Sequence, residues 1–546
     1  MSILLFSAIS NLQLYSQVLP AHIFDNNMVL QRGKPVRIWG TAQSREKIKV
    51  EFAGQIKTTT ADDQGNWIVF LDPMTASSEP RVMKVSARSG NVSFSNVLVG
   101  DLWVLGGQSN MEFDLARIFH GDVEILSAHY QGIRLMTLPS SANLEPKKDF
   151  DRINEYDSWY DRFDKKGYWF ICSPETVPTF SGLGYVFGRR LYTASQVPIG
   201  LIDVSLGGTT VEAWLKPETL AKMAENRLLL KQWNDKVVAW DSASSAPNPL
   251  YDRNFPGSSY TGMIAPIAGM TVKGIIFHQG YNNALEDARP DLYSLNFQTL
   301  IQDWRDAFMD PELPFGIIEL SAGGEPQTLD NYELRMIDPA PAIREGQLKA
   351  FLDIKNTGFA SAYDQQVNWY HPQKKVELGE RMARWALKTQ YGFDITWEPS
   401  RILKTEIVGD SLVVTFSKEV KTSDDRPIEG FCLSGPDHHF YPSKASYWSY
   451  LDEKGQKVDD KTKVVVWNRL VDNPVALRYA WARNPLGNLV NQDCPLIPVP
   501  LYRSDSWNYP EAPFEPDAYA VHRTNLRAMR KIALEQARDR IQREKE

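Results

Sequence analysis

Apolar runs of two kinds divide the chain. From residue 19 to about 100, short β-branched and aromatic runs such as PVRIWG, GNWIVFLD and RVMKVSA alternate with polar turns such as residues 63–66. This spacing is typical of a small β sandwich. From residue 101, runs that are apolar throughout (DLWVLGG, PIGLIDVSLGG, VKGIIFHQG, PFGIIELS) alternate with amphipathic helical patterns. Continuous apolar strands between such helices indicate an α/β domain whose parallel sheet is covered on both faces.

The same pattern predicts how the chain is organised. We expect a β domain at 19–100, an α/β domain at 101–392, a second β region at 393–508 and a charged helix at 509–546, after a short segment at 1–18. A helix docked on the protein is the simpler interpretation of the last segment, and an oligomer contact is the alternative. No other feature indicates an oligomer.

The first segment contains the apolar run ILLFSAIS, which is too short to span a bilayer. We interpret it as the remnant of an export signal, which predicts a secreted or periplasmic protein. A disordered or strand-forming N-terminus is the alternative. No other segment reaches transmembrane length, so no membrane span is expected.

Size and charge narrow the class of protein. A chain of 546 residues exceeds what one hydrophobic core usually organises. The net charge of −7 argues against a nucleic-acid partner, because no basic excess is present to neutralise phosphates. The three cysteines, Cys172, Cys432 and Cys494, lie far apart and allow one disulfide at most.

Ser109 is the first candidate for chemistry. It lies in GGQSNME, directly after the apolar run LWVL. A serine in a turn often only bonds backbone donors. A nucleophilic serine also needs a base and an oxyanion hole, which other parts of the chain must supply.

His371 is the strongest candidate for the base among eight histidines. It precedes Pro372, which suits the first turn of an amphipathic helix. The apolar positions of that helix are Leu378, Met382, Trp385 and Ala386. A histidine at the entry of the last α/β helix is expected at the sheet edge, where the other turns gather. A polar helix cap is an equally good interpretation.

Polar and glycine-rich turns after two further strands are candidates for the oxyanion hole. SLGGTTVEAW contributes Gly207 and Gly208, which allow a close backbone approach with free N–H groups. HQGYNN contributes the amides of Gln279, Asn282 and Asn283. Each turn alone could be a tight turn without a ligand, but several at corresponding strand ends favour a site.

Taken in order, these motifs resemble the sialate O-acetylesterase-like family of SGNH hydrolases. The resemblance covers residues 19 to about 508. The matching stretches are IFDNNMVLQRGKPVRIWG, GDLWVLGGQSNMEF, FSGLGYVFGRRL, PIGLIDVSLGGTTVEAWL, GMIAPIAGMTVKGIIFHQGYNNA, DWRDAF, LPFGIIELS, IREGQ, HPQKKVELGERMA, GFCLSG, VALRYAWARNPLGNLVN and LYRSDSW. It implies a flavodoxin-like, three-layer α/β domain with a parallel sheet, flanked by N- and C-terminal β-sandwich-like regions.

The resemblance also implies roles. Ser109 matches the nucleophile and His371 the general base, while Gly208 and Asn283 match oxyanion donors beside the Ser109 N–H. The residues expected to line the pocket are Gln108, Gln279, Tyr281 and Arg344. The implied reaction is two-step removal of acetyl groups from sialic acid or another acetylated glycan, with no metal or organic cofactor.

Two positions depart from the family pattern. Tyr281 stands where the family usually has Glu, and Asn368 stands where many SGNH enzymes have Asp, three residues before the base. Replacing an orienting Asp by Asn in a Ser-His-Asp triad costs about 10⁴ in rate. Asp364 is a candidate for the missing carboxylate, and a backbone carbonyl is the alternative. The chain could instead be a catalytically impaired, glycan-binding member of the family.

Two long irregular stretches, 138–178 and 236–262, are rich in aromatic and small polar residues. Loops of this length in a compact domain are often functional, so we expect them to form walls that select the substrate. For the flanking β regions we favour structural support of the cleft over separate sugar binding.

Overall fold

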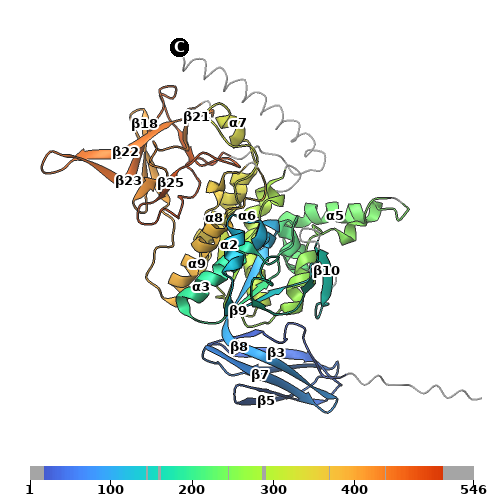
Figure 1. The fold of residues 1–546 in the computed structure, drawn as a ribbon. Coiled ribbons are helices and arrows are strands. Elements are labelled where there is room, and N and C mark those ends of the chain that lie inside the picture. Colours follow the sequence, from blue (N-terminus) through green and yellow to red (C-terminus); the bar gives the residue numbers. More distant parts are fainter. Residues whose placement is uncertain are drawn as a thin grey trace, which may run out of the picture.

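The computed structural model describes residues 17–142, 146–157, 162–243, 245–285, 290–367, 369–436 and 438–507. An N-terminal β region, a central α/β region and a C-terminal β region follow one another in space as they do in the sequence (Figure 1). The helix predicted at 509–546, most of the segment 1–18 and Asn368 lie outside the described residues.

Two groups of strands form the N-terminal region. The first is an antiparallel sheet of β1 (Leu19–Pro20), β3 (Val36–Thr41) and β6 (Asn66–Leu71). The second contains β2 (Val29–Gln31), β4 (Lys47–Phe52), β5 (Gln55–Thr60), β7 (Ser77–Ala87) and the first half of β8 (Gly90–Gly107). In β4, Ile48, Val50 and Phe52 are buried while Lys47 and Lys49 are exposed. This alternation is what a sheet with one face on the core requires.

β8 continues for 18 residues into the central sheet. The strand order there is β12-β9-β13-β8-β14-β15-β16, and every pair from β9 to β16 is parallel. The other strands are β9 (Tyr130–Thr137), β12 (Phe170–Cys172), β13 (Ile199–Asp203), β14 (Gly274–His278), β15 (Phe315–Ile318) and β16 (Thr357–Ala360). The predicted parallel sheet is confirmed, and the boundary expected between residues 100 and 101 falls inside β8.

Helices cover both faces of this sheet. On one face Phe277 of β14 packs against Trp304, with ring centroids 5.4 Å apart, while its neighbour Ile276 belongs to the opposite core with Trp385. The main helices are α3 (Gly182–Ser195) and α9 (Lys375–Tyr391), which pack together, and α6 (Pro290–Ala307) and α8 (Ala340–Asp353), which also pack together. Shorter or peripheral helices are α1 (Ser109–Glu112), α2 (Gly121–Leu126), α4 (Pro217–Lys222), α5 (Arg227–Ala239) and α7 (Tyr332–Met336).

The amphipathic pattern of α9 is confirmed, with a correction at its start. Its four predicted apolar positions, Leu378, Met382, Trp385 and Ala386, are buried. The helix begins at Lys375, three residues after Pro372. The sequence had suggested that Pro372 lies in the first turn of the helix. In the structure it precedes the helix instead.

Several antiparallel sheets form the C-terminal region. One has the order β17-β18-β23-β22, another β21-β20-β24-β26, and β19 pairs with β25. The strands are β17 (Ile402–Val408), β18 (Ser411–Phe416), β19 (Val420–Thr422), β20 (Phe431–Ser434), β21 (Phe440–Pro442), β22 (Lys444–Leu451), β23 (Lys457–Trp467), β24 (Ala476–Tyr479), β25 (Leu489–Asn491) and β26 (Tyr502–Arg503). A separate hairpin of β10 (Ile153–Asp157) and β11 (Arg162–Lys166) lies in the first long loop.

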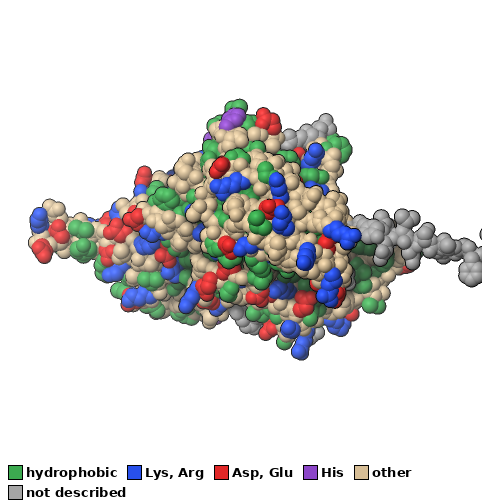
Figure 2. Space-filling model, turned by 90° about the horizontal axis from the view of Figure 1, so that it is seen from below, with side chains coloured by type: hydrophobic (Ala, Val, Ile, Leu, Met, Phe, Trp, Pro, Cys, Tyr) green, Lys and Arg blue, Asp and Glu red, His purple; other side chains and the backbone are tan. Residues whose placement is uncertain are grey.

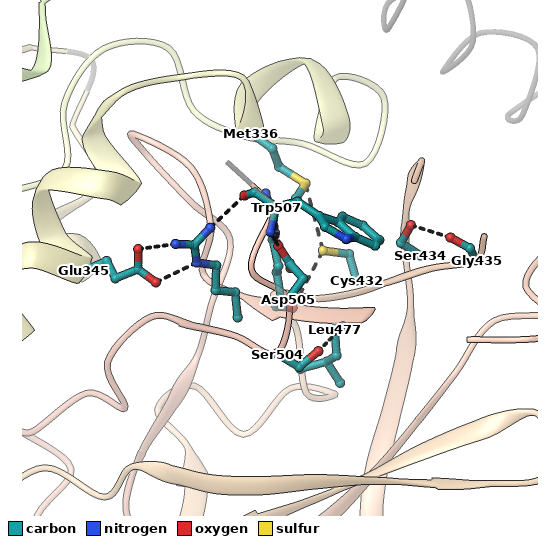
Figure 3. Close-up of polar contacts among 11 residues, drawn as sticks. Met336, Glu345, Cys432, Ser434, Gly435, Leu477, Ser504, Asp505 and Trp507 are labelled. Carbon is teal, nitrogen blue, oxygen red and sulfur yellow. Dashed lines mark hydrogen bonds and ion pairs between the residues drawn. The ribbon is translucent and has the colours of Figure 1, made fainter. Parts of the chain in front are cut away.

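Polar contacts fasten the C-terminal region to α7 and α8. Glu345 of α8 accepts two hydrogen bonds from Arg503, at 2.6 and 2.7 Å, and Arg503 also donates to the carbonyl of Trp507 at 2.8 Å (Figure 3). Beside them, the sulfur atoms of Met336 and Cys432 lie 3.9 Å apart. All three cysteines are buried and free.

The surface carries both signs of charge. Seen from the N-terminal end, basic and acidic side chains are interspersed across the visible face (Figure 2). Among the described helices, none combines the length and apolar character needed to cross a bilayer.

Close packing of β16 on α9 gives a test of the fold. A Cβ added to Gly358 would overlap the rigid indole ring of Trp385, so we expect Gly358→Ala to destabilise the central domain by about 1–3 kcal/mol. Denaturant unfolding followed by tryptophan fluorescence measures this. Thr389→Ala, at an exposed position of α9, is the control and should change stability by about 0.5 kcal/mol at most. Equal stability of both variants would contradict the packing described here.

Candidate active site

The ends of three parallel strands bring the predicted turns together. Gly107 at the end of β8 lies opposite His278 of β14, and Leu105 lies opposite Asp203 of β13. A Cβ on Gly107, whose φ is +133°, would overlap the backbone of His278. Only glycine therefore allows the chain to leave β8 this close to β14.

The side chain of Gln108 joins two of these turns and is itself almost fully buried. Its Oε1 accepts a hydrogen bond from Gly280 N at 3.1 Å, and its Nε2 donates to Asn282 Oδ1 at 3.1 Å. Asn282 Nδ2 in turn donates to the carbonyl of Gly208 at 2.8 Å. Gln108, expected to line the pocket, therefore holds the three turns in one hydrogen-bonded network.

Ser109 begins α1, and its side chain is partly exposed. A Cβ added to Gly207 would lie 3.3 Å from Ser109 Cβ, so the second glycine turn is in contact with the serine. Among the described residues, neither the Ser109 N–H nor the Gly208 N–H has a hydrogen-bond acceptor. Two free N–H groups beside a serine at a helix N-terminus form a suitable environment for an oxyanion.

The two neighbouring asparagines of HQGYNN have different surroundings. Asn283 is 1% exposed, and its Oδ1 accepts from Val211 N and Gln279 Nε2, both at 2.8 Å. Its Nδ2 donates to Glu212 Oε2 at 3.0 Å. Gln279 is also buried and donates to the carbonyl of Thr209 at 3.0 Å. Asn283 and Gln279 thus brace the turn from within, whereas Asn282 carries the amide that bonds Gly208.

Aromatic rings surround His371. Its ring centroid is 4.4 Å from that of Tyr370, 5.1 Å from Trp369 and 5.4 Å from Phe113. Its Nε2 is buried without a hydrogen-bond partner, so no hydrogen bond joins this atom to Ser109. Burial, together with the nearby charges of Lys375 and Arg117, lowers the pKa of His371 to about 4.

Asn110 connects the serine turn to the segment that carries His371. Its Nδ2 donates to the carbonyl of Tyr370 at 3.0 Å, and its Oδ1 accepts from Lys375 Nζ at 2.6 Å. Lys375 is fully buried, and burial lowers its pKa to about 7. Asn110 follows Ser109 directly, so this bridge fixes the position of His371 relative to the candidate nucleophile.

Asp364 does not orient His371 in this structure. Its carboxylate accepts two hydrogen bonds from Arg381 of α9, at 2.8 and 2.5 Å. Arg381 is nearly buried and also donates to the carbonyls of Ser361 and Leu496. The expected Asp364–His371 pair is therefore replaced by an ion pair that anchors the segment before α9.

Arg344 is likewise not a pocket residue. It is fully buried, and its guanidinium donates to the carbonyls of Leu320, Ala482 and Arg483 at 2.6–2.8 Å. Burial lowers its pKa to about 10. The sequence motif marked Arg344 as a substrate contact, but all its bonds tie α8 and the end of β15 to the C-terminal region.

Tyr281 forms part of an aromatic surface next to His371. Its ring centroid is 5.8 Å from that of Tyr370, and the guanidinium of Arg483 lies 5.2 Å from the Tyr281 ring. Trp369 and Tyr370 are 38% and 48% exposed. The C-terminal region thus contributes the cation of Arg483 to the surface that Tyr281 helps to form.

Glu112 places a carboxylate on the same side of α1 as Ser109. Residues three apart on a helix share a face, and Glu112 Oε2 accepts the N–H of Gly207 at 2.7 Å. Burial raises the pKa of Glu112, and the bond from Gly207 and the charges of Lys166, Arg253 and Arg117 oppose that rise. No group of three or more His, Cys, Asp or Glu side chains suited to a metal occurs in the described part of the chain.

Comparison with known proteins agrees with this geometry. A family model described as carbohydrate esterase, sialic acid-specific acetylesterase, matches residues 99–388, more than half of the chain. The chain belongs to this family. It is therefore a carbohydrate esterase, and the resemblance inferred from its motifs is confirmed.

Relatives extend the match to the flanking regions. The sialate O-acetylesterases of Mus musculus and Homo sapiens are 27% and 26% identical to this chain, over 85% and 90% of its length and 90% and 91% of theirs. The crystal structure of a carbohydrate acetylesterase from Xanthomonas citri is 27% identical, covers 90% of this chain and 100% of its own, and superposes with a TM-score of 0.74.

Sequence reasoning missed several residues of this carbohydrate esterase site. Asn110 and Glu112 lie inside GGQSNME, and the helical spacing from Ser109 could have indicated Glu112. Lys375 begins α9. A lysine at the start of an amphipathic helix is expected to be exposed to solvent, but this one is buried. Nothing in the sequence distinguishes Arg253, whose Nη1 donates to the carbonyl of Gly207 at 2.7 Å.

The Asn110 bridge generates a prediction. Asn110→Ala leaves the buried ammonium of Lys375 without its oxygen acceptor, which we expect to cost about 1–3 kcal/mol of unfolding free energy. Ester hydrolysis should fall as well, because the His371 segment loses its bond to the serine turn. Denaturant unfolding and acetate release measure the two effects.

Asn491→Ala is the matched control, because Asn491 is buried and bonds Ser400 and Glu398 in the C-terminal region. It should lower stability with little change in turnover. If both variants lost turnover in proportion to stability, Asn110 would have no specific role at the site.

Proposed function

We propose that this carbohydrate esterase is a serine O-acetylesterase that acts on an acetylated glycan, with Ser109 as nucleophile and His371 as general base. One observation carries the proposal. Ser109 lies where three strand ends meet, beside two free N–H groups, and Asn110 connects this turn to the segment of a histidine whose Nε2 is free. A nucleophile, a base and oxyanion donors are the groups from the protein on which the proposed chemistry depends.

The reaction has two steps. Ser109 Oγ attacks the acetyl carbonyl while His371 takes its proton, and the tetrahedral intermediate is stabilised by the N–H groups of Ser109 and Gly208. Asn283, which the family resemblance assigned to this hole, is buried and its Nδ2 donates to Glu212 at 3.0 Å, so the proposed oxyanion hole consists of the two backbone N–H groups. His371 then returns the proton to the departing sugar oxygen, and an acetyl-serine remains. Water, deprotonated by His371, releases acetate and restores Ser109.

His371 would work without a carboxylate from Asp364, which is bound by Arg381. In a Ser-His-Asp triad the acid stabilises the imidazolium that forms during the reaction. The neighbours of His371 are aromatic rings and two cations, so its charged form is disfavoured. We therefore infer a base that stays neutral well into the acid range.

An acetylated sugar fits the surroundings of the site. The exposed faces of Trp369 and Tyr370, with Tyr281 beside them, offer planar apolar surfaces on which the C–H faces of a sugar ring can pack. The named relatives are sialate O-acetylesterases and a carbohydrate acetylesterase, which supports sialic acid or another acetylated glycan as substrate. Export from the cytoplasm stays a prediction from the apolar N-terminal run.

Substitution of the nucleophile is the direct test. We expect Ser109→Ala to lower kcat/KM for acetate release from p-nitrophenyl acetate and from acetylated glycans by at least about 1,000-fold. Ser446→Ala, which removes an exposed serine on β22, is the control and should leave the rate unchanged.

Full activity of Ser109→Ala would rule out the proposed nucleophile. An inactive natural protein that Tyr281→Glu makes active would instead favour the alternative of a glycan-binding member whose chemistry was lost at residue 281.

The pH dependence follows from His371. A general base acts in its unprotonated form, so activity is lost as pH falls through its pKa. With a pKa of about 4, kcat/KM should stay level from pH 7 to about 5 and decline tenfold per unit well below pH 4. Initial rates across this range, with circular dichroism to detect acid unfolding, measure it. A decline centred near pH 6.5 would contradict the inferred environment of His371.

A further inference from the structure

The peptide group between Gly207 and Gly208 is held by an arginine that belongs to no motif of the family resemblance. Arg253 Nη1 donates to the carbonyl oxygen of Gly207 at 2.7 Å, and Arg253 Cδ lies near Gly208, 3.5 Å from where a Cβ of that residue would be. Carbonyl and N–H of one trans peptide point in opposite directions. The guanidinium thus fixes the side to which the Gly208 N–H points, away from Arg253.

The peptide groups on either side are fixed as well. Gly207 N donates to Glu112 Oε2 at 2.7 Å, and the carbonyl of Gly208 accepts from Asn282 Nδ2 at 2.8 Å. Gly208 has a φ of +75°, a conformation that glycine adopts without strain. The Gly207 N–H and the carbonyls of Gly207 and Gly208 therefore each have a hydrogen-bond partner. The Gly208 N–H has no acceptor among the described residues.

The loop that carries Arg253 is itself tied to this turn. Asn254 Oδ1 accepts the N–H of Thr210 at 2.7 Å, and Asn254 N donates to Asp252 Oδ1 at 2.8 Å. Arg253 is exposed to solvent, so it is not part of a core that the fold needs. The bond between Asn254 and Thr210 holds the backbone of Arg253 beside the glycine turn, and the Arg253 side chain donates to the Gly207 carbonyl.

We propose that Arg253 is a positioning residue for the oxyanion hole: it orients the Gly207–Gly208 peptide and polarises it, so that the Gly208 N–H is a stronger and better-directed donor. This proposal rests on the proposed serine esterase function. A cation at a carbonyl oxygen draws electron density from the peptide, and the delocalised C–N bond transmits this effect to the N–H of the same peptide group. Preorganised donors of this kind stabilise charge that develops only in the transition state.

The role predicts which kinetic constant changes. A donor that acts on the developing oxyanion alters kcat, whereas an arginine that binds the sugar alters KM. Removal of an oxyanion donor itself lowers kcat by about 10²–10³. Loss of the group that orients and polarises that donor should lower it by roughly 10- to 100-fold.

The experiment compares Arg253→Met, Arg253→Lys and the control Arg88→Met, which removes an exposed arginine of the N-terminal region. Steady-state hydrolysis of p-nitrophenyl acetate and of an acetylated glycan gives kcat and KM for each substrate. Inactivation by diethyl p-nitrophenyl phosphate gives a second readout, because Ser109 Oγ bonds to phosphorus, p-nitrophenolate leaves, and the phosphoryl oxygen occupies the oxyanion position. Thermal melting shows whether each variant is folded.

We expect Arg253→Met to lower kcat and the inactivation rate together, with KM within about twofold of the natural protein and an unchanged melting temperature. Arg253→Lys, which keeps the charge but not the planar geometry, should recover part of the loss. A change confined to KM, or kcat and inactivation rates equal to those of Arg88→Met, would overturn the proposal. An active Ser109→Ala would overturn the proposed function itself, so the two failures are distinguishable.

Discussion

The parallel register of β8, β13 and β14 is the constraint on which the site depends. Parallel strands end at the same edge of a sheet, so the turns that follow them must share a small space. At this edge Gly107 lies against the backbone of His278, and Gly207 lies against Ser109. The buried side-chain amide of Gln108 then fixes the relative positions of two turns. Its oxygen accepts from Gly280 and its nitrogen donates to Asn282, and both of these residues lie in the turn after β14.

The proposed base, His371, is positioned in a different way. His371 belongs to the segment between β16 and α9, which has no regular strand to hold it. The segment is fixed by Asp364 on Arg381, by Asn110 on the carbonyl of Tyr370, and by Asn484 of the C-terminal region, which donates to the carbonyl of Val367 at 3.3 Å. The last of these bonds ties the segment that carries His371 to the C-terminal region.

Patterns that are local in the sequence predicted the main elements of the central domain, but not the strands β10, β11 and β12 in the stretch 138–178, which was expected to be irregular. The strands that became β13, β14 and β15, the buried face of α9, and the glycine turns all follow from spacing and residue type. The pairing of charged and amide side chains did not follow, because it is decided by which distant elements pack together. Asp364 was assigned to His371 by its position in the chain, yet the buried guanidinium of Arg381 lies within reach and binds it. Arg344 was assigned to the pocket by the family resemblance of its motif, yet its guanidinium is buried and bonded to three backbone carbonyls.

The single strand β8 has a consequence for how the enzyme can move. Its first half belongs to the N-terminal sheet and its second half ends two residues before Ser109. No linker separates the two, so the N-terminal region cannot swing as a tethered accessory module that captures a polymer and delivers it. Any rotation between the regions would have to bend the central strand itself. A mechanical or thermal disturbance of the N-terminal sheet is therefore transmitted along the continuous strand β8 to the turn that contains Ser109.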